Sequence, residues 1–189
     1  MELAVVLAII AVLAAVLTPV VINYVDQART VRATADVKVI ADGIRLYQRD
    51  TGRFPIYTSN ANGNSDTAAA TLLTGPGNSH SATNHADWAA FTTTTDLAGQ
   101  LNVNLLGLST GSQVSSLGRI AYRGPYIAAI DTDPWGSRYV VTATNLRRAS
   151  NDWAFVISAG LDGELDSDPT QANTTAFAVL GDDIVAIIK

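Results

Sequence analysis

The apolar positions of this chain change their pattern within its first fifty residues. Residues 3–22 are apolar throughout apart from Thr18, and twenty helical residues span roughly 30 Å, the thickness of the hydrocarbon core of a bilayer. Further along, the apolar residues recur every three or four positions, as in an amphipathic helix; they are Ala33, Val37, Ile40, Ile44 and Tyr47. The pattern predicts one long helix, whose first half needs lipid or copies of itself and whose second half needs a folded domain on one face.

The pattern after this helix predicts two further regions. Gly52 and Pro55 are helix-ending signals. Residues 53–118 are rich in Thr, Ser, Asn, Gly and Ala, as in loops and short strands. From 119 onward, short apolar runs alternate with turn signals such as Asp133-Pro134-Trp135-Gly136. We therefore expect an α+β fold with a helix at 1–52, a variable surface insertion at 53–118, and a small antiparallel sheet with an acidic loop at 119–189, the sheet packing on the helix.

Two residues break the apolar rule of the first segment. Glu2 places a carboxylate at the start of a membrane-length helix, where an unpaired charge is costly. It is either an interfacial residue favoured by the positive helix N-terminus or a group that pairs with the terminal ammonium of a neighbouring subunit. Pro19 removes one intrahelical hydrogen bond; it is either a simple kink or a weak point at which the helix melts on assembly.

The sequence ELAVVLAIIAVLAAVLTP resembles the N-terminal segment of type IV pilins and type II secretion pseudopilins. The family's glutamate and proline have the same separation as Glu2 and Pro19. The resemblance implies cleavage by a prepilin peptidase and methylation of the new N-terminal residue, which would be Met1 if nothing preceded it. The family's glutamate lies three positions further from the mature N-terminus, so either three residues precede Met1 or processing differs. We favour the former because the internal spacing is intact.

Motifs in the last seventy residues resemble those of major pseudopilins. Gly124-Pro125-Tyr126 and the sequence DPWGSRY from Asp133 are similar to that group's GPY and DPWGxxY elements. Residues 158–163 (SAGLDG) and 181–184 (GDDI) are similar to its SxGxDG and DDI elements. The insertion has no counterpart in this comparison.

Acidic residues concentrate near the C-terminus: Asp162, Glu164, Asp166, Asp168, Asp182 and Asp183. From the residues alone they are either a solvated acidic loop or ligands of a hard cation such as Ca²⁺, which takes several oxygens. The family resemblance implies a calcium loop, to which Asp162, Asp182 and Asp183 fit best. His80, His85 and Asp87 lie in the insertion, where we expect polar loop residues in preference to a metal site.

Composition and the absence of catalytic motifs disfavour several classes of function. The net charge of −5 disfavours a nucleic-acid surface, and the lack of cysteine excludes disulfides and thiolate sites. The sequence contains no nucleophile elbow, phosphate-binding loop or HExxH motif. We expect a structural protein and not an enzyme; a membrane-tethered binding domain or enzyme is the less favoured alternative.

The resemblance implies a homo-oligomer, a helical filament of identical subunits assembled by inner-membrane machinery. The exposed insertion favours an extracellular type IV pilus-like filament, while the DPWG and DDI elements favour a periplasmic pseudopilus that acts as a secretion piston. We favour the pilus. The expected location is the bacterial inner membrane before assembly and the cell surface afterwards.

Overall fold

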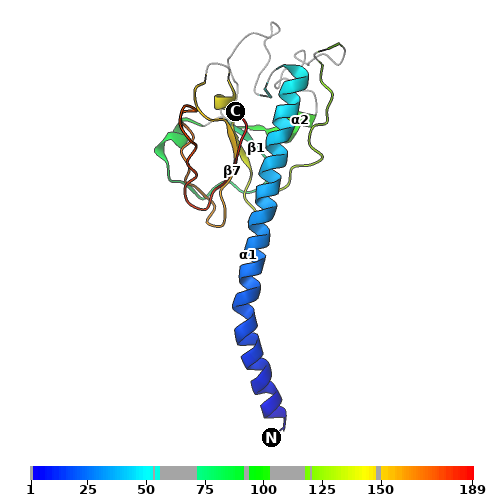
Figure 1. Ribbon diagram of the computed structural model, residues 1–189, viewed down its shortest axis with the longest axis vertical. Coiled ribbons are helices and arrows are strands. Elements are labelled where there is room, and N and C mark those ends of the chain that lie inside the picture. Colours follow the sequence, from blue (N-terminus) through cyan, green and yellow to red (C-terminus); the bar gives the residue numbers. More distant parts are fainter. Residues whose placement is uncertain are drawn as a thin grey trace.

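The computed structural model describes residues 2–52, 54–55, 72–91, 94–102, 118–119, 121–147 and 150–189. One long helix projects well beyond a small mixed α+β domain that packs against its C-terminal half (Figure 1). The elements in chain order are α1 (Glu2–Thr51), β1 (Leu72–Thr74), β2 (Ala82–Thr83), the 3₁₀ helix η1 (Ala86–Ala90), β3 (Thr94–Asp96), α2 (Leu97–Asn102), β4 (Val140–Thr142), the 3₁₀ helix η2 (Ala143–Leu146), β5 (Phe155–Ser158), β6 (Glu164–Leu165) and β7 (Ile184–Ile187).

Helix α1 ends where the sequence predicted. Gly52 has a φ of 70°, a left-handed conformation that glycine adopts without a Cβ clash, and its N–H donates to the carbonyl of Gln48 at 2.8 Å. The predicted amphipathic face is also confirmed, because all five of its apolar residues are buried. They contact the sheet chiefly through β5 and β7.

The main sheet has five strands in the order β3-β1-β4-β5-β7. All neighbouring pairs are antiparallel except β1 and β3, which run parallel. The expected small antiparallel sheet on a long helix is therefore present, with one parallel pair at its edge. Strands β4 and β5 coincide with the runs expected after residue 119, whereas β1 and β3 come from 53–118. Two of the five strands thus belong to the region that we expected to be a surface insertion.

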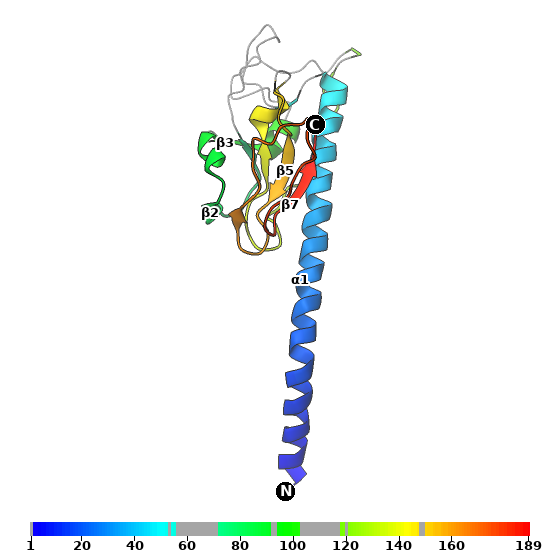
Figure 2. The same ribbon diagram turned by 60° about the vertical axis from the view of Figure 1, so that its left-hand side comes forward.

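Both faces of this sheet are covered. Side chains such as Val141 and Val156 lie on the face toward α1, in a cluster with Ile44 and Tyr47. The alternate residues of β4 and β5, among them Phe155, point to the opposite face and cluster there with Trp88 of η1. Figure 2 shows the sheet between α1 and the segment that carries β2 and η1.

This second cluster ties part of the 53–118 region to the core of the domain. Trp88 is 4% exposed, and its indole N–H donates to the carbonyl of Ser167 at 2.8 Å. Leu97 and Leu101 of α2 are buried on the helix side of the sheet. Apolar side chains on both faces of a sheet need cover, and the described part of 53–118 supplies part of it.

The C-terminal strand is tied to α1 by an arginine. Arg45 donates from Nη2 to the carbonyl of Ile187 at 2.7 Å and from Nε to that of Ile188 at 3.3 Å. Its Nη1 also lies 2.9 Å from Asp42 Oδ1, one turn earlier on the helix. The C-terminus therefore lies beside the upper half of the helix, as Figure 1 shows.

Candidate functional sites

The first half of α1 is an exposed apolar surface. The stretch that begins at Leu3 is long and apolar enough to cross a membrane, and its most apolar part is wholly unburied. Leu3 is 81% exposed, and Leu17, near the end of the stretch, is still 57% exposed. A membrane anchor and a signal sequence are both compatible with this segment. Met1 and the side chain of Glu2 lie outside what the structure describes.

Pro19 interrupts the hydrogen bonding of α1 without ending the helix. The helix runs continuously from Glu2 to Thr51, although proline lacks the N–H that would reach the carbonyl of Ala15. The neighbouring Thr18 hydroxyl donates to the carbonyl of Ala14 at 2.7 Å. The ladder is therefore weakest within the exposed apolar half of the helix.

The Asp133–Gly136 turn is built around a buried carboxylate. Asp133 is 3% exposed, and its Oδ1 accepts the N–H groups of Trp135 at 3.1 Å and Ser137 at 2.7 Å. Its Oδ2 accepts the hydroxyl of Ser158 at 2.8 Å. Ser158 is the first residue of the segment that leads into the acidic loop, so Asp133 connects the turn to that loop.

Three of the six acidic residues come together. Oxygen atoms of Asp162, Asp166 and Asp182 all lie within 4.8 Å of one another. Asp182 Oδ2 accepts the N–H groups of Leu161 and Asp162, which holds the two parts of the loop together. No basic side chain in the described ranges forms an ion pair with any of the three.

The clustering affects the protonation of Asp162. The backbone N–H of Glu164, 2.9 Å from Asp162 Oδ1, lowers the pKa of the Asp162 carboxyl. Desolvation and the neighbouring charges of Asp182 and Asp166 outweigh that effect, so the pKa is raised overall. A bound cation would relieve this repulsion.

Asp183 is a buried carboxylate that binds the backbone of the acidic loop. It is 7% exposed, and its Oδ2 accepts the N–H groups of Asp166 at 3.0 Å and Ser167 at 2.7 Å. Its Oδ1 is buried and has no hydrogen-bond partner. Burial raises the pKa of Asp183 to about 6, against the opposing effect of the donors on Ser167 and Asp166.

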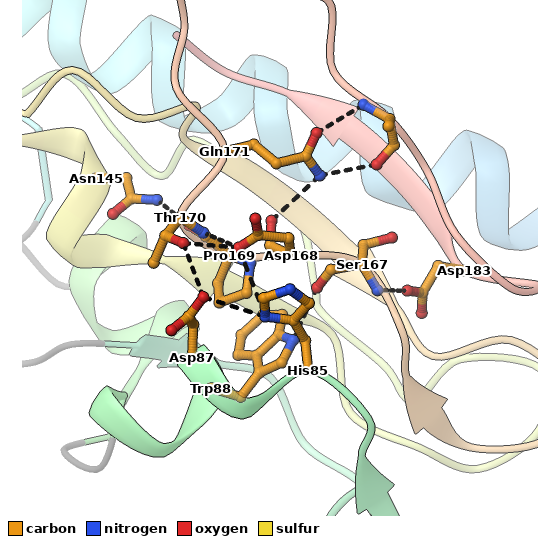
Figure 3. Close-up of polar contacts among 11 residues, drawn as sticks. His85, Asp87, Trp88, Asn145, Ser167, Asp168, Pro169, Thr170, Gln171 and Asp183 are labelled. Carbon is orange, nitrogen blue, oxygen red and sulfur yellow. Dashed lines mark hydrogen bonds and ion pairs between the residues drawn. The ribbon is translucent and has the colours of Figure 1, made fainter.

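The remaining acidic residues do not join this group of oxygens. Glu164 Oε2 instead accepts the amide of Asn84 at 2.6 Å, and the same amide nitrogen lies 2.6 Å from Asp166 Oδ1. Asp168 lies in a different cluster, beside His85 and Asp87 (Figure 3). Asn84 could not be predicted as part of this site, since a single asparagine in a Thr/Asn-rich region carries no distinguishing signal.

The two histidines are in different environments. His80 Nε2 lies 3.1 Å from the carbonyl of Arg138, which makes Nε2 the donor. Burial lowers the pKa of His80 from 6.5, against the opposing effect of this hydrogen bond. His85 lies at the start of η1, where its ring nitrogen faces carboxylates.

No protein-family model matches the chain, and neither a curated protein nor a solved structure shows significant similarity to it.

Proposed function

We propose that this chain is a structural subunit of an extracellular type IV pilus-like helical filament, assembled through its N-terminal helix. One observation carries the proposal. A single continuous helix has one half packed into a folded domain and the other half, about 30 Å long, exposed and apolar on all sides.

The exposed half of α1 requires an apolar environment. Full burial of one Val, Leu or Ile side chain is worth about 1.5–3 kcal/mol, and this segment exposes many of them. A bilayer provides such an environment before assembly, and neighbouring copies of the helix provide it afterwards. The folded domain lies beside the C-terminal half only (Figure 2), so the N-terminal halves of several copies can pack side by side without collision between domains.

Glu2 and Pro19 have roles in this assembly. Glu2 pairs with the terminal ammonium of a neighbouring subunit, which removes the cost of an unpaired charge in an apolar core. Pro19 is the position where the hydrogen-bond ladder already lacks one bond, so the helix lengthens there first when subunits are drawn together. The chain is processed by a prepilin peptidase and its new N-terminus is methylated.

The test is to shear the surface of cells that produce the chain and to examine the released material by electron microscopy and N-terminal mass spectrometry. Filaments with a processed, methylated N-terminus are expected. Glu2→Ala should lower the filament yield, whereas Asp26→Ala, which removes an exposed carboxylate further along the same helix, should not. A normal yield from Glu2→Ala would count against its pairing role, and an unprocessed N-terminus would leave only a membrane-tethered domain.

A periplasmic pseudopilus of a type II secretion system is the second candidate. The observation that favours it is the direct link between the two pseudopilin-like motifs, because the carboxylate of Asp133 in the turn accepts a hydrogen bond from Ser158 at the end of β5, where the second motif begins. The same shearing experiment separates the two. Processed chain retained in the cell envelope and absent from the sheared fraction would favour the pseudopilus.

We further propose that the loop of Asp162, Asp166 and Asp182 binds Ca²⁺. Calcium takes six to eight oxygen ligands, of which these carboxylates supply three, and backbone carbonyls and water would complete the set. The unpartnered buried Oδ1 of Asp183 and the raised pKa of Asp162 fit a loop whose charge is balanced by a cation.

Calcium should therefore raise the melting temperature and protease resistance of the full chain in detergent micelles, relative to the chelated protein. Asp182→Asn should remove most of this effect, whereas Asp168→Asn should leave it intact, because Asp168 lies outside the cluster. Equal melting temperatures with and without Ca²⁺ would rule the site out.

A further inference from the structure

A second group of metal-ligating side chains lies on the face of the domain far from α1. His85 and Asp87 belong to the start of η1, and Asp168 belongs to the segment between β6 and β7. Figure 3 shows the three side chains facing one another across these two segments. We propose that they form a binding site for a divalent transition metal such as Zn²⁺.

The distances suit a tetrahedral ion. Zinc bonds to His nitrogen and carboxylate oxygen are about 2.0–2.2 Å long, so two ligands of a tetrahedral ion lie roughly 3.3–3.6 Å apart. His85 Nδ1 lies 3.3 Å from Asp87 Oδ2 and 3.8 Å from Asp168 Oδ1. The three ligand atoms all lie within 4.8 Å of one another, so the group would contract around the ion, with water or a fourth ligand at the open position.

The imidazole nitrogen is available for a metal. His85 Nδ1 is inaccessible to solvent and takes part in no hydrogen bond, despite its closeness to two carboxylates. Its side chain does not cap η1 either. A neutral imidazole nitrogen with a free lone pair is a preferred zinc ligand, and it distinguishes this group from the all-oxygen cluster of Asp162, which suits calcium.

The carboxylates are already oriented by hydrogen bonds. The Thr170 hydroxyl lies 3.2 Å from Asp87 Oδ2 and 2.8 Å from Asp168 Oδ1, and the Thr170 N–H donates to Asp168 Oδ1 at 2.7 Å. Such outer contacts fix metal ligands and raise affinity. Asn145 holds the next residue by donating to the carbonyl of Pro169 at 2.6 Å.

The ion would fasten η1 to the C-terminal segment. The two are already in contact through Trp88 and Ser167 and through Asp87 and the Thr170 hydroxyl, and β2, just before η1, pairs with β6. A bond through the metal joins residues that are far apart in sequence, so metal binding should stabilise the folded domain by an amount that rises with the free zinc concentration. The site would control how firmly the segment that covers the second face of the sheet is held.

The test uses the full chain in detergent micelles, freed of metal by chelation and titrated with Zn²⁺ by calorimetry and thermal melting. The calorimetric titration should saturate at one equivalent, and Zn²⁺ should raise the melting temperature. His85→Gln should lower zinc affinity by more than roughly tenfold, and Thr170→Val by roughly ten- to hundredfold, because outer hydrogen bonds carry that much affinity. Asp182→Asn, in the other cluster, should retain the full zinc response.

Cobalt provides an independent readout. Co²⁺ at a tetrahedral site should give visible absorption bands that Zn²⁺ displaces and that His85→Gln abolishes. Metal-free melting temperatures of both variants show whether each has folded. If His85→Gln does not fold, the loss of zinc affinity in Thr170→Val still tests the site. The proposal fails if Zn²⁺ leaves the melting temperature unchanged, or if His85→Gln binds zinc as tightly as the parent chain.

Discussion

The Ser158 hydroxyl donates to Asp133 Oδ2 at 2.8 Å, which connects a turn to the end of strand β5. Both residues are buried, and the other oxygen of Asp133 accepts two backbone N–H groups of the turn. One carboxylate therefore satisfies three donors, of which those of Ser137 and Ser158 are buried and that of Trp135 is partly buried. Donors left without partners in such a place cost about 1–3 kcal/mol each.

The first prediction concerns this carboxylate. Asp133→Ala removes the acceptor for all three donors, so it should lower the free energy of unfolding by about 3–5 kcal/mol. Asp133→Asn keeps an Oδ1 acceptor for the two backbone N–H groups, and the Ser158 hydroxyl can turn to accept from the new amide. Its cost should be less than half that of Asp133→Ala, as measured by chemical denaturation. Equal costs for both would show that charge, and not hydrogen bonding, holds the turn.

The second prediction compares two residues of α1. Ile44 is 0% exposed and faces the sheet, whereas Val39 is 56% exposed. Ile44→Ala leaves a cavity and should cost about 2–5 kcal/mol, and Val39→Ala should change stability by no more than about 0.5 kcal/mol. The experiment is thermal and denaturant unfolding of both variants. A large loss of stability for Val39→Ala would indicate that the exposed side of α1 is buried against another copy of the chain in the sample.

The helix was predictable because its signals are long and periodic. The stripe from Ala33 to Tyr47 and the stop at Gly52 follow from spacing and glycine chemistry. Strands β1 and β3 have three residues each, too short for an alternating pattern to register. Trp88 and its neighbour Phe91 are large apolar residues in a polar region, which indicates contact with the core but not which face of the sheet they cover.

The division of the acidic residues between two clusters also could not be predicted from the sequence. Asp166 and Asp168 are two positions apart, yet Asp166 joins Asp162 and Asp182 while Asp168 joins His85. Asp183 accepts hydrogen bonds from the N–H groups of Asp166 and Ser167. These bonds fix the path of the backbone between Asp166 and Asp168, and so direct the two side chains to different clusters. Only tertiary hydrogen bonds make that division, and charge density along the sequence does not reveal it.

The third prediction is a pH dependence at His80. Burial lowers the pKa of His80 below 6.5 in the folded chain, with Arg138 and Asp133 as its charged neighbours, so the unfolded chain takes up a proton at a pH where the folded chain does not. The His80 contribution to the free energy of unfolding is therefore fully present above about pH 6.5 and is lost below it. It opposes the contribution of Asp183, whose raised pKa lets the folded chain take up a proton more readily than the unfolded chain.

The matched variant for this test is His80→Gln, which keeps an amide donor for the Arg138 carbonyl but does not titrate. Unfolding curves between pH 7.5 and 5.5 should show a smaller loss of stability for the variant than for the parent chain. Parallel curves would mean that His80 does not contribute to the pH dependence of stability.

The last prediction links backbone geometry to the calcium loop. Gly181 has a φ of 62°, and a Cβ at this position would overlap the carboxylate of Asp166. Gly181→Ala should therefore force Asp166 to rotate away from Asp162 and Asp182 and to lose its contact with Asn84. We expect a backbone cost of about 1–2 kcal/mol together with a marked loss of Ca²⁺ affinity.

Gly136→Ala separates these two effects. Gly136 also has a positive φ, 90°, but its nearest neighbour to a new Cβ is the Asn78 amide nitrogen at 3.7 Å, an ordinary contact. It should therefore incur a similar backbone cost and leave calcium affinity unchanged, as measured by calorimetric titration. If Gly181→Ala bound calcium as tightly as Gly136→Ala, Asp166 would not be a ligand, and the ion would have to be held by Asp162 and Asp182 with backbone oxygens.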